Sequence, residues 1–229
     1  MILLCTLEHQ PSDLAVLKRV AKPILRDTAF DPVGKSESRQ LEFFAGRAAL
    51  VLAFEKLGWR GYVEPDPTFG YLCAHSESEG TFSKCFSNIS HTKNMAVAVV
   101  GMSPVGVDVE LISRDPSKVL ERVAMEEELL GLKSLSLVVE GARVPGSVAL
   151  WSAKEAVSKA IGLGIKFGMR DFVVDLKGPL PHHVQVRRSG PLELIDPVIR
   201  FYRQGNYLIA LCSARQEMSL GIERIQGKY

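Results

Sequence analysis

The sequence predicts an α+β fold made of two similar, pseudo-symmetric halves, residues 1–112 and 113–229. One observation behind this prediction is an internal echo, because residues 94–108 resemble residues 206–223 in their order of apolar, small and acidic residues. The other is that each stretch follows a segment with helical spacing. Chance matching of β-branched runs is the alternative explanation. If the echo reflects a repeat, we expect the active site in the cleft between the halves.

Three segments are predicted to be helices. Residues 37–57 place apolar side chains at helical spacing, and Gly58 follows where a helix would end. Residues 121–132 and 147–161 show similar spacing, and glycines interrupt the pattern after the last of them.

The remaining elements are predicted to be strands. Residues 61–90 are rich in Gly, Pro, Ser and Glu, which indicates a long irregular connection with one short strand. Residues 95–100 and 105–111 are apolar runs on either side of a turn, a pattern typical of a hairpin. Five further strands are expected in the last third of the chain, at residues 172–176, 183–188, 198–203, 207–213 and 218–224.

Composition and charge indicate a globular protein without a strong overall field. The 229 residues are 46% apolar, and 28 basic against 26 acidic residues give a formal charge of +2. This balance argues against nucleic acid or a membrane surface as a partner. No stretch approaches the roughly 18 apolar residues that a membrane-spanning helix needs. We therefore expect a cytoplasmic protein with reduced, mostly structural cysteines at positions 5, 73, 85 and 212.

Two carboxylates stand one residue apart in the predicted strand at residues 105–111. Side chains alternate along a strand, so Asp108 and Glu110 point to one face while Val107 and Val109 point to the other. Two neighbouring anions repel each other unless something neutralises them, and a hard divalent cation such as Mg²⁺ accepts such oxygen ligands. The polar outer face of an edge strand would show the same pattern, so this pair alone decides nothing.

A third carboxylate lies beside lysines on the predicted helix at residues 147–161. Glu155 and Lys159 are four residues apart and share a face, and Lys154 lies beside them. A solvated ion pair is one explanation. A metal together with lysines would also be a suitable clamp for a pyrophosphate, because phosphoryl transfer depends chiefly on positioning and on charge stabilisation.

Ser90 and His91 precede the predicted strand at residues 95–100. Adjacent side chains on an extended segment point to opposite faces, so the two residues make a poor nucleophile and base for one hydrolytic site. His91 could instead donate to a phosphate, or could be a capping or exposed histidine.

Taken in order along the chain, four blocks resemble the signature of the Sfp-type 4'-phosphopantetheinyl transferase family. These blocks are Arg39–Arg47, Ser90-His91, Val105–Glu110 and Trp151–Gly162. Four blocks in the right order are far more specific than any one of them. The last third of the chain resembles the family only in its richness in strands.

The resemblance implies a pseudo-twofold pair of α+β halves and a transfer reaction. The enzyme would move the 4'-phosphopantetheine arm of coenzyme A to a serine of an apo acyl or peptidyl carrier protein, releasing adenosine 3',5'-bisphosphate. Asp108, Glu110 and Glu155 match the ligands of Mg²⁺, which Mn²⁺ could replace. Glu155 also matches the base, and Lys159 matches a lysine that stabilises the leaving group.

The same resemblance suggests residues that contact coenzyme A. Lys154 and Lys159 match lysines near the phosphates, and His91 matches a histidine near the 3'-phosphate. Arg47 matches a phosphate contact, and Ser90 belongs to the same block as His91. A two-halved chain contains its own cleft, so we expect a monomer.

Some features stay open at this point. The family has a further glutamate near its site, and any of the consecutive Glu126, Glu127 and Glu128 could match it. The pathway of the carrier protein is not encoded in a recognisable motif. A non-catalytic module that binds coenzyme A or a carrier, and a metal-dependent phosphohydrolase, are the alternative functions.

Overall fold

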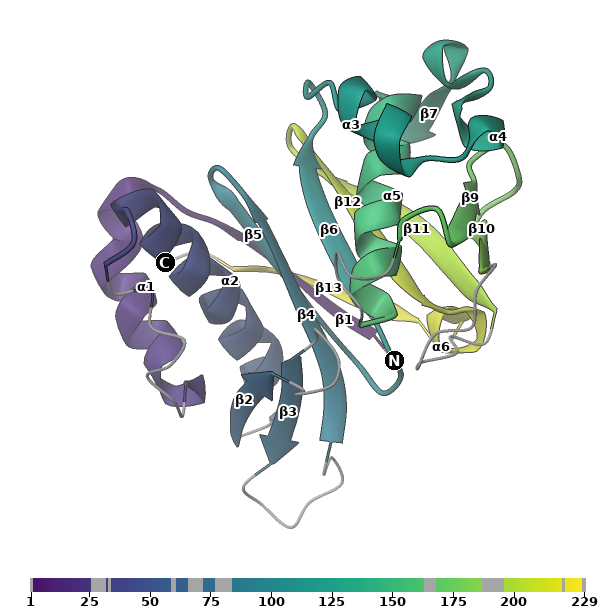
Figure 1. Cartoon of the computed structure of the whole chain (residues 1–229). Coiled ribbons are helices and arrows are strands. Elements are labelled where there is room, and N and C mark those ends of the chain that lie inside the picture. Colours follow the sequence, from purple (N-terminus) through teal and green to yellow (C-terminus); the bar gives the residue numbers. More distant parts are fainter. Residues whose placement is uncertain are drawn as a thin grey trace. The chain divides into compact units, whose positions relative to one another are not determined.

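The computed structural model describes residues 2–25, 32, 34–58, 61–65, 72–76, 84–162, 168–186, 196–219 and 221–227. The chain forms two compact units (Figure 1). Unit 1 contains Met1–Ser103 and Glu217–Tyr229, and unit 2 contains Pro104–Gln216. None of the described helices is long and apolar enough to cross a membrane.

Unit 1 is a six-stranded sheet with helices on one face (Figure 1). The strand order is β13-β1-β5-β4-β3-β2, in which β13 is parallel to β1 and the other neighbours are antiparallel. Helix α2 packs against β1, β4 and β5, and α1 packs against α2. The elements are β1 (Ile2–Glu8), η1 (Pro11–Asp13), α1 (Leu14–Ala21), η2 (Lys22–Ile24), α2 (Glu37–Lys56), β2 (Gly61–Pro65), β3 (Leu72–Ser76), β4 (Lys84–Thr92), β5 (Met95–Gly101) and β13 (Ile222–Gly227).

Unit 2 is a five-stranded antiparallel sheet in the order β6-β12-β11-β10-β9, with a separate hairpin of β7 and β8. Helix α5 packs against β6 and β12. The elements are β6 (Gly106–Leu111), α3 (Ser117–Val123), α4 (Glu126–Leu129), η4 (Leu132–Ser134), β7 (Ser136–Val139), β8 (Ala142–Pro145), α5 (Gly146–Ala160), β9 (Phe172–Asp175), β10 (His182–Val186), β11 (Pro197–Gln204), β12 (Tyr207–Ala214) and α6 (Arg215–Ser219), which extends into unit 1.

The α+β prediction is confirmed, and so are the helices expected at residues 37–57 and 147–161. The two sheets share an order of elements. In unit 1, β1 precedes the helices and pairs with β5, the last strand of the meander β2-β3-β4-β5. In unit 2, β6 precedes the helices and pairs with β12, the last strand of the meander β9-β10-β11-β12. A pseudo-symmetric relation between the units stays a prediction. The chain was expected to divide between residues 112 and 113, but the structure divides it after residues 103 and 216. Strand β6 belongs to unit 2 because it pairs with β12, and β13 belongs to unit 1 because it pairs with β1.

The predicted hairpin of residues 95–100 and 105–111 is wrong. Both segments are strands, but β5 lies in the sheet of unit 1 and β6 in the sheet of unit 2. The turn between them therefore connects the two sheets. An apolar run indicates a buried strand but does not specify which neighbour the strand will have.

Other local predictions also failed. The helix expected at residues 121–132 is broken at Ala124 and Met125, which have extended backbone, and Gly131 has a φ of +75°. Residues 61–90 contain three strands where one was expected, and β1, α1 and the β7–β8 hairpin were not predicted. The strand expected at residues 218–224 lies at residues 222–227, after α6.

Gly106 allows β6 and α5 to approach each other closely. A Cβ atom at this position would lie 2.0 Å from the carbonyl oxygen of Ala156 and 2.5 Å from the backbone nitrogen of Ala160. Both contacts are with helix backbone, which cannot move aside as a flexible side chain would. The small residues at this crossing therefore set the distance between the strand and the helix.

We predict that Gly106→Ala lowers the free energy of unfolding by about 3 kcal/mol, because the added methyl group forces β6 and α5 apart. Urea denaturation measures this change. Gly168→Ala is a suitable control, since among the described residues its new Cβ would meet the side chain of Asp171, with Oδ2 at 3.3 Å, and no helix backbone. Equal effects of the two substitutions would contradict the close approach as the cause.

Candidate active site

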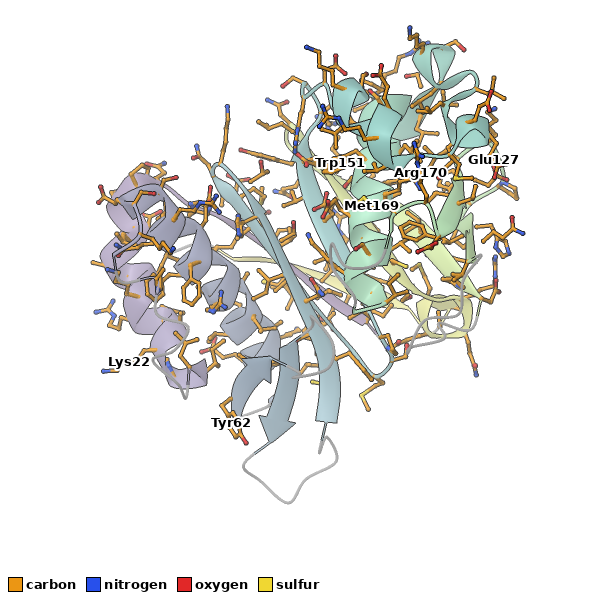
Figure 2. The ribbon with its side chains drawn as sticks, viewed as in Figure 1. Lys22, Tyr62, Glu127, Trp151, Met169 and Arg170 are labelled. Carbon is orange, nitrogen blue, oxygen red and sulfur yellow. The ribbon has the colours of Figure 1, made fainter. Side chains whose placement is uncertain are left out.

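A group of acidic and basic side chains forms where α5 crosses β6 in unit 2. Trp151, Glu155 and Lys159 are spaced four residues apart on α5, so they lie along one face of the helix. Asp108 and Glu110 come from β6, the strand on which α5 packs. Figure 2 shows Trp151 on this helix. The structure therefore brings together the carboxylates that the sequence predicted from separate segments.

Asp108 is held by two donors from α5. Lys159 Nζ lies 2.9 Å from Asp108 Oδ1, and Ser152 Oγ donates to Asp108 Oδ2 at 3.0 Å. Asp108 is 5% exposed, so its charge needs these partners. Lys159 also donates to the carbonyl of Val107 at 3.0 Å. The helix and the strand are thus joined by polar contacts as well as by packing.

Glu110 is held by a different pair of donors. Trp151 Nε1 donates to Glu110 Oε1 at 2.7 Å, and Arg114 forms an ion pair with the same oxygen. The Arg114 guanidinium also lies 5.6 Å from the centre of the Trp151 ring. Both contacts use one oxygen of Glu110, and they fix the orientation of this carboxylate.

Glu155 is half-buried and interacts electrostatically with the same group of side chains. Burial raises the pKa of Glu155, and Lys159 opposes the rise. Asp108 and Glu110 raise the pKa further, whereas Arg114 lowers it. Glu155 therefore holds a proton more readily than an ordinary glutamate, which suits a group that takes up a proton during a reaction.

Asp108, Glu110 and Glu155 are the residues of this group that could bind a metal ion. Among the described residues, no three His, Cys, Asp or Glu side chains are arranged to hold a metal ion. Lys159 and Arg114 instead neutralise Asp108 and Glu110. The donor chemistry nevertheless fits Mg²⁺, which in proteins commonly has one or two carboxylate ligands and completes its shell with water and phosphate oxygens. Two of these carboxylates, on one strand, satisfy that requirement.

Lys154 does not join this group. Its side chain is completely buried, and its Nζ lies 2.8 Å from Glu128 Oε2 and 2.8 Å from the carbonyl oxygen of Met169. This contradicts the expectation that Lys154 contacts phosphates. Lys154 and Glu155 are consecutive on a helix, so their side chains diverge by about 100° and cannot share one face.

The other residues expected to contact coenzyme A belong to unit 1. Ser90 is buried and His91 is exposed, as alternation along β4 requires, and His91 Nδ1 lies 3.7 Å from Glu42 Oε2. Arg47 donates to the carbonyl of Phe43 at 3.2 Å and covers the Phe43 ring, while burial lowers the pKa of Arg47 to about 10. That these residues and the carboxylates of unit 2 serve one ligand stays a prediction.

Sequence reasoning assigned no role to three residues that shape the group in unit 2. Trp151 and Ser152 precede Glu155 by four and three residues, a spacing that places them near its face of the helix and could have identified them. Arg114 follows Glu110 by four residues, but it does so across a turn. Among the three consecutive glutamates that the sequence left open, Glu128 is the buried one, and no local pattern distinguishes it.

Comparison with known proteins gives a family-model match that lies within unit 2, and matches to curated relatives. Residues 104–212 match the family model of the 4'-phosphopantetheinyl transferase superfamily. A curated 4'-phosphopantetheinyl transferase from Aneurinibacillus migulanus, gsp, is 29% identical over 110 residues, and one from Bacillus pumilus, psf-1, is 34% identical over 89 residues. These alignments cover 48% and 39% of this chain, but only 45% and 37% of the relatives. The chain thus spans less than half the length of the curated relatives that it matches.

The match to the family model contains the strand and the helix that form the group described above, with Asp108, Glu110, Glu155 and Lys159. Two of the four signature blocks, Val105–Glu110 and Trp151–Gly162, lie within this match, whereas Arg39–Arg47 and Ser90-His91 lie before it. Residues 104–212 are therefore similar to the 4'-phosphopantetheinyl transferase superfamily.

Proposed function

We propose that this protein transfers the 4'-phosphopantetheine arm of coenzyme A to a serine of an apo acyl or peptidyl carrier protein. The observation that carries the proposal is the junction of β6 and α5, where Lys159 and Ser152 hold Asp108 while Glu155 interacts with both Asp108 and Glu110. A cluster of carboxylates beside a lysine is suited to a pyrophosphate substrate with a divalent cation. The superfamily match supports the reaction class.

In this proposal Asp108, Glu110 and Glu155 would hold Mg²⁺. When bound, the metal would supply positive charge to the pyrophosphate of coenzyme A. Asp108 and Glu110 are buried and already oriented by hydrogen bonds, so little rearrangement of the carboxylates is needed when a cation replaces Lys159 or Arg114 as their partner. Mn²⁺ accepts the same oxygen ligands and would serve as a substitute.

The chain's own residues would carry the transfer. Glu155 takes the proton from the hydroxyl of the carrier serine, since its raised pKa makes it a better base for such a group than an ordinary carboxylate. The serine oxygen forms a bond to the β-phosphorus of coenzyme A, and the bond from that phosphorus to the bridging oxygen breaks. Lys159 stabilises the charge that develops on adenosine 3',5'-bisphosphate as it leaves.

Residues of unit 1 are proposed to bind the rest of coenzyme A. His91 is exposed, and its Nδ1 lies 3.7 Å from Glu42 Oε2. Arg47, together with Ser90 and His91, would then contact phosphate groups. We further propose that the protein acts as a cytoplasmic monomer, and two buried free cysteines, Cys5 and Cys212, agree with a reducing compartment.

The transfer is tested by incubating the protein with an apo carrier protein, coenzyme A and Mg²⁺. We predict a mass gain of one phosphopantetheine arm on the carrier, measured by intact-protein mass spectrometry. Asp108→Asn and Glu155→Gln should lower the rate by about 100-fold or more, because each removes a charged oxygen from the reacting site. Absence of the gain across several acyl and peptidyl carriers would refute the proposal, and release of product from coenzyme A without a carrier would favour a hydrolase.

Ser152 gives a separate prediction about metal binding. Ser152→Ala removes the hydrogen bond to Asp108 Oδ2 and should weaken Mg²⁺ binding roughly tenfold, as loss of a ligand-orienting hydrogen bond does elsewhere. Calorimetric titration with Mg²⁺ in the presence of coenzyme A measures this affinity. Ser147→Ala makes the same chemical change at the beginning of α5 and should leave the affinity as in the wild type. Equal affinities of the two variants would show that Asp108 needs no support from Ser152.

A further inference from the structure

A completely buried ion pair lies within unit 2, on another side of α5 from the carboxylates. Lys154 Nζ is 2.8 Å from Glu128 Oε2, and the two side chains are 0% and 1% exposed. A buried charge is tolerated only when it is paired and its remaining hydrogen-bonding groups are satisfied. The surroundings of both charges therefore show what the pair does.

The pair occupies the open edge of the five-stranded sheet. Strand β9 is the last strand of that sheet and has β10 as its neighbour within the described residues. Lys154 Nζ donates to the carbonyl of Phe172 at 3.1 Å, and the backbone nitrogen of Val174 donates to Glu128 Oε1 at 2.9 Å. Residues 172 and 174 are two apart, so these groups lie on the same edge of β9. The ion pair thus makes the hydrogen bonds that a neighbouring strand would make along this edge of β9.

The same two side chains connect further segments to α5. Glu128 Oε2 accepts from the backbone nitrogen of Met125, at the beginning of α4, at 2.7 Å. Lys154 donates to the carbonyl of Met169, 2.8 Å away, so three acceptors surround its three N–H groups. Figure 2 labels Met169, and also Glu127, which precedes Glu128 in α4. Helix α5 is therefore joined to α4, to the segment before β9 and to β9 itself.

We propose that Lys154 is a positioning residue, which with Glu128 fixes the rotation of α5 against the sheet edge and so holds Glu155 in place. Consecutive helix residues move together, and a rotation that displaced Lys154 from Glu128 would carry Glu155 away from Asp108 and Glu110. A role as a phosphate ligand is disfavoured, since Lys154 would have to leave Glu128 buried and unpaired. The catalytic consequence rests on the proposed function, whereas the structural role does not.

The test compares two lysines of the same helix. We expect Lys154→Met to lower the midpoint of thermal unfolding by roughly 10 °C, because Glu128 is left as an unpaired buried charge. Exchange of the Val174 amide hydrogen should become faster, because its acceptor is no longer held. In the folded protein, the Mg²⁺ concentration for half-maximal activity should rise about tenfold, as expected when support for a metal ligand is lost.

Lys159→Met is the matched control. Binding of coenzyme A in the presence of EDTA, measured by calorimetry, should weaken in Lys159→Met and stay at the wild-type value in Lys154→Met. Glu128→Gln keeps an acceptor for Val174 but removes the charge, and it should reproduce the Lys154→Met pattern more weakly, even if Lys154→Met itself fails to fold.

Two outcomes would overturn the proposal. One is an unchanged unfolding midpoint in folded Lys154→Met or Glu128→Gln. The other is a loss of metal-free coenzyme A binding in Lys154→Met as large as in Lys159→Met. If the wild-type protein does not bind coenzyme A at all, the proposed function fails, while unfolding and amide exchange still decide the role of the ion pair.

Discussion

The close crossing of β6 and α5 is the constraint on which the rest of the candidate site depends. Gly106 lets the helix backbone approach the strand, and at that distance Ser152 and Lys159 both reach Asp108. A wider separation would deprive this buried carboxylate of both donors, at a cost of several kcal/mol. The polar contacts of Asp108 therefore depend on the close packing of small residues between β6 and α5.

Helix α5 is held on two sides by interactions of different kinds. Toward β6 it meets carboxylates that are partly neutralised by Lys159 and Arg114, and Lys159 keeps 24% of its side chain exposed. Toward β9 it carries Lys154, whose charge is enclosed and fully bonded. A partly exposed ion pair can exchange partners with a ligand at modest cost, whereas an enclosed pair cannot. The two lysines of one short motif thus have different physical roles.

Patterns with a fixed period were the part of the structure that the sequence predicted best. Glu155 and Lys159 share a face because a helix repeats every 3.6 residues, and Asp108 and Glu110 share a face because a strand repeats every two. A period along the chain does not show which elements pack together. The run at residues 105–111 is a strand as expected, yet it pairs with β12 and not with β5. Glu128 could not be selected from its neighbours, since its partner Lys154 lies on another element. The assignment of Lys154 to phosphate failed because a motif gives residue order, whereas burial depends on the sheet edge that the helix covers.

The internal echo raises the question of why one unit carries the acidic group. The two stretches of the echo, residues 94–108 and 206–223, end on Asp108 and Glu223. In unit 1, Glu223 on β13 forms an ion pair with Lys56 on α2 at 3.1 Å, much as Asp108 pairs with Lys159 of α5. The side chains of Lys56 and Glu223 are 52% and 42% exposed, whereas that of Asp108 is 7% exposed. Water screens the exposed pair and weakens the electric field around it. The residue two positions after Glu223 is Ile225, whereas the residue two positions after Asp108 is a second carboxylate, Glu110. Both units place an acidic strand residue beside a helix lysine. The group in unit 2 differs because its acidic residue is buried and has a second carboxylate beside it.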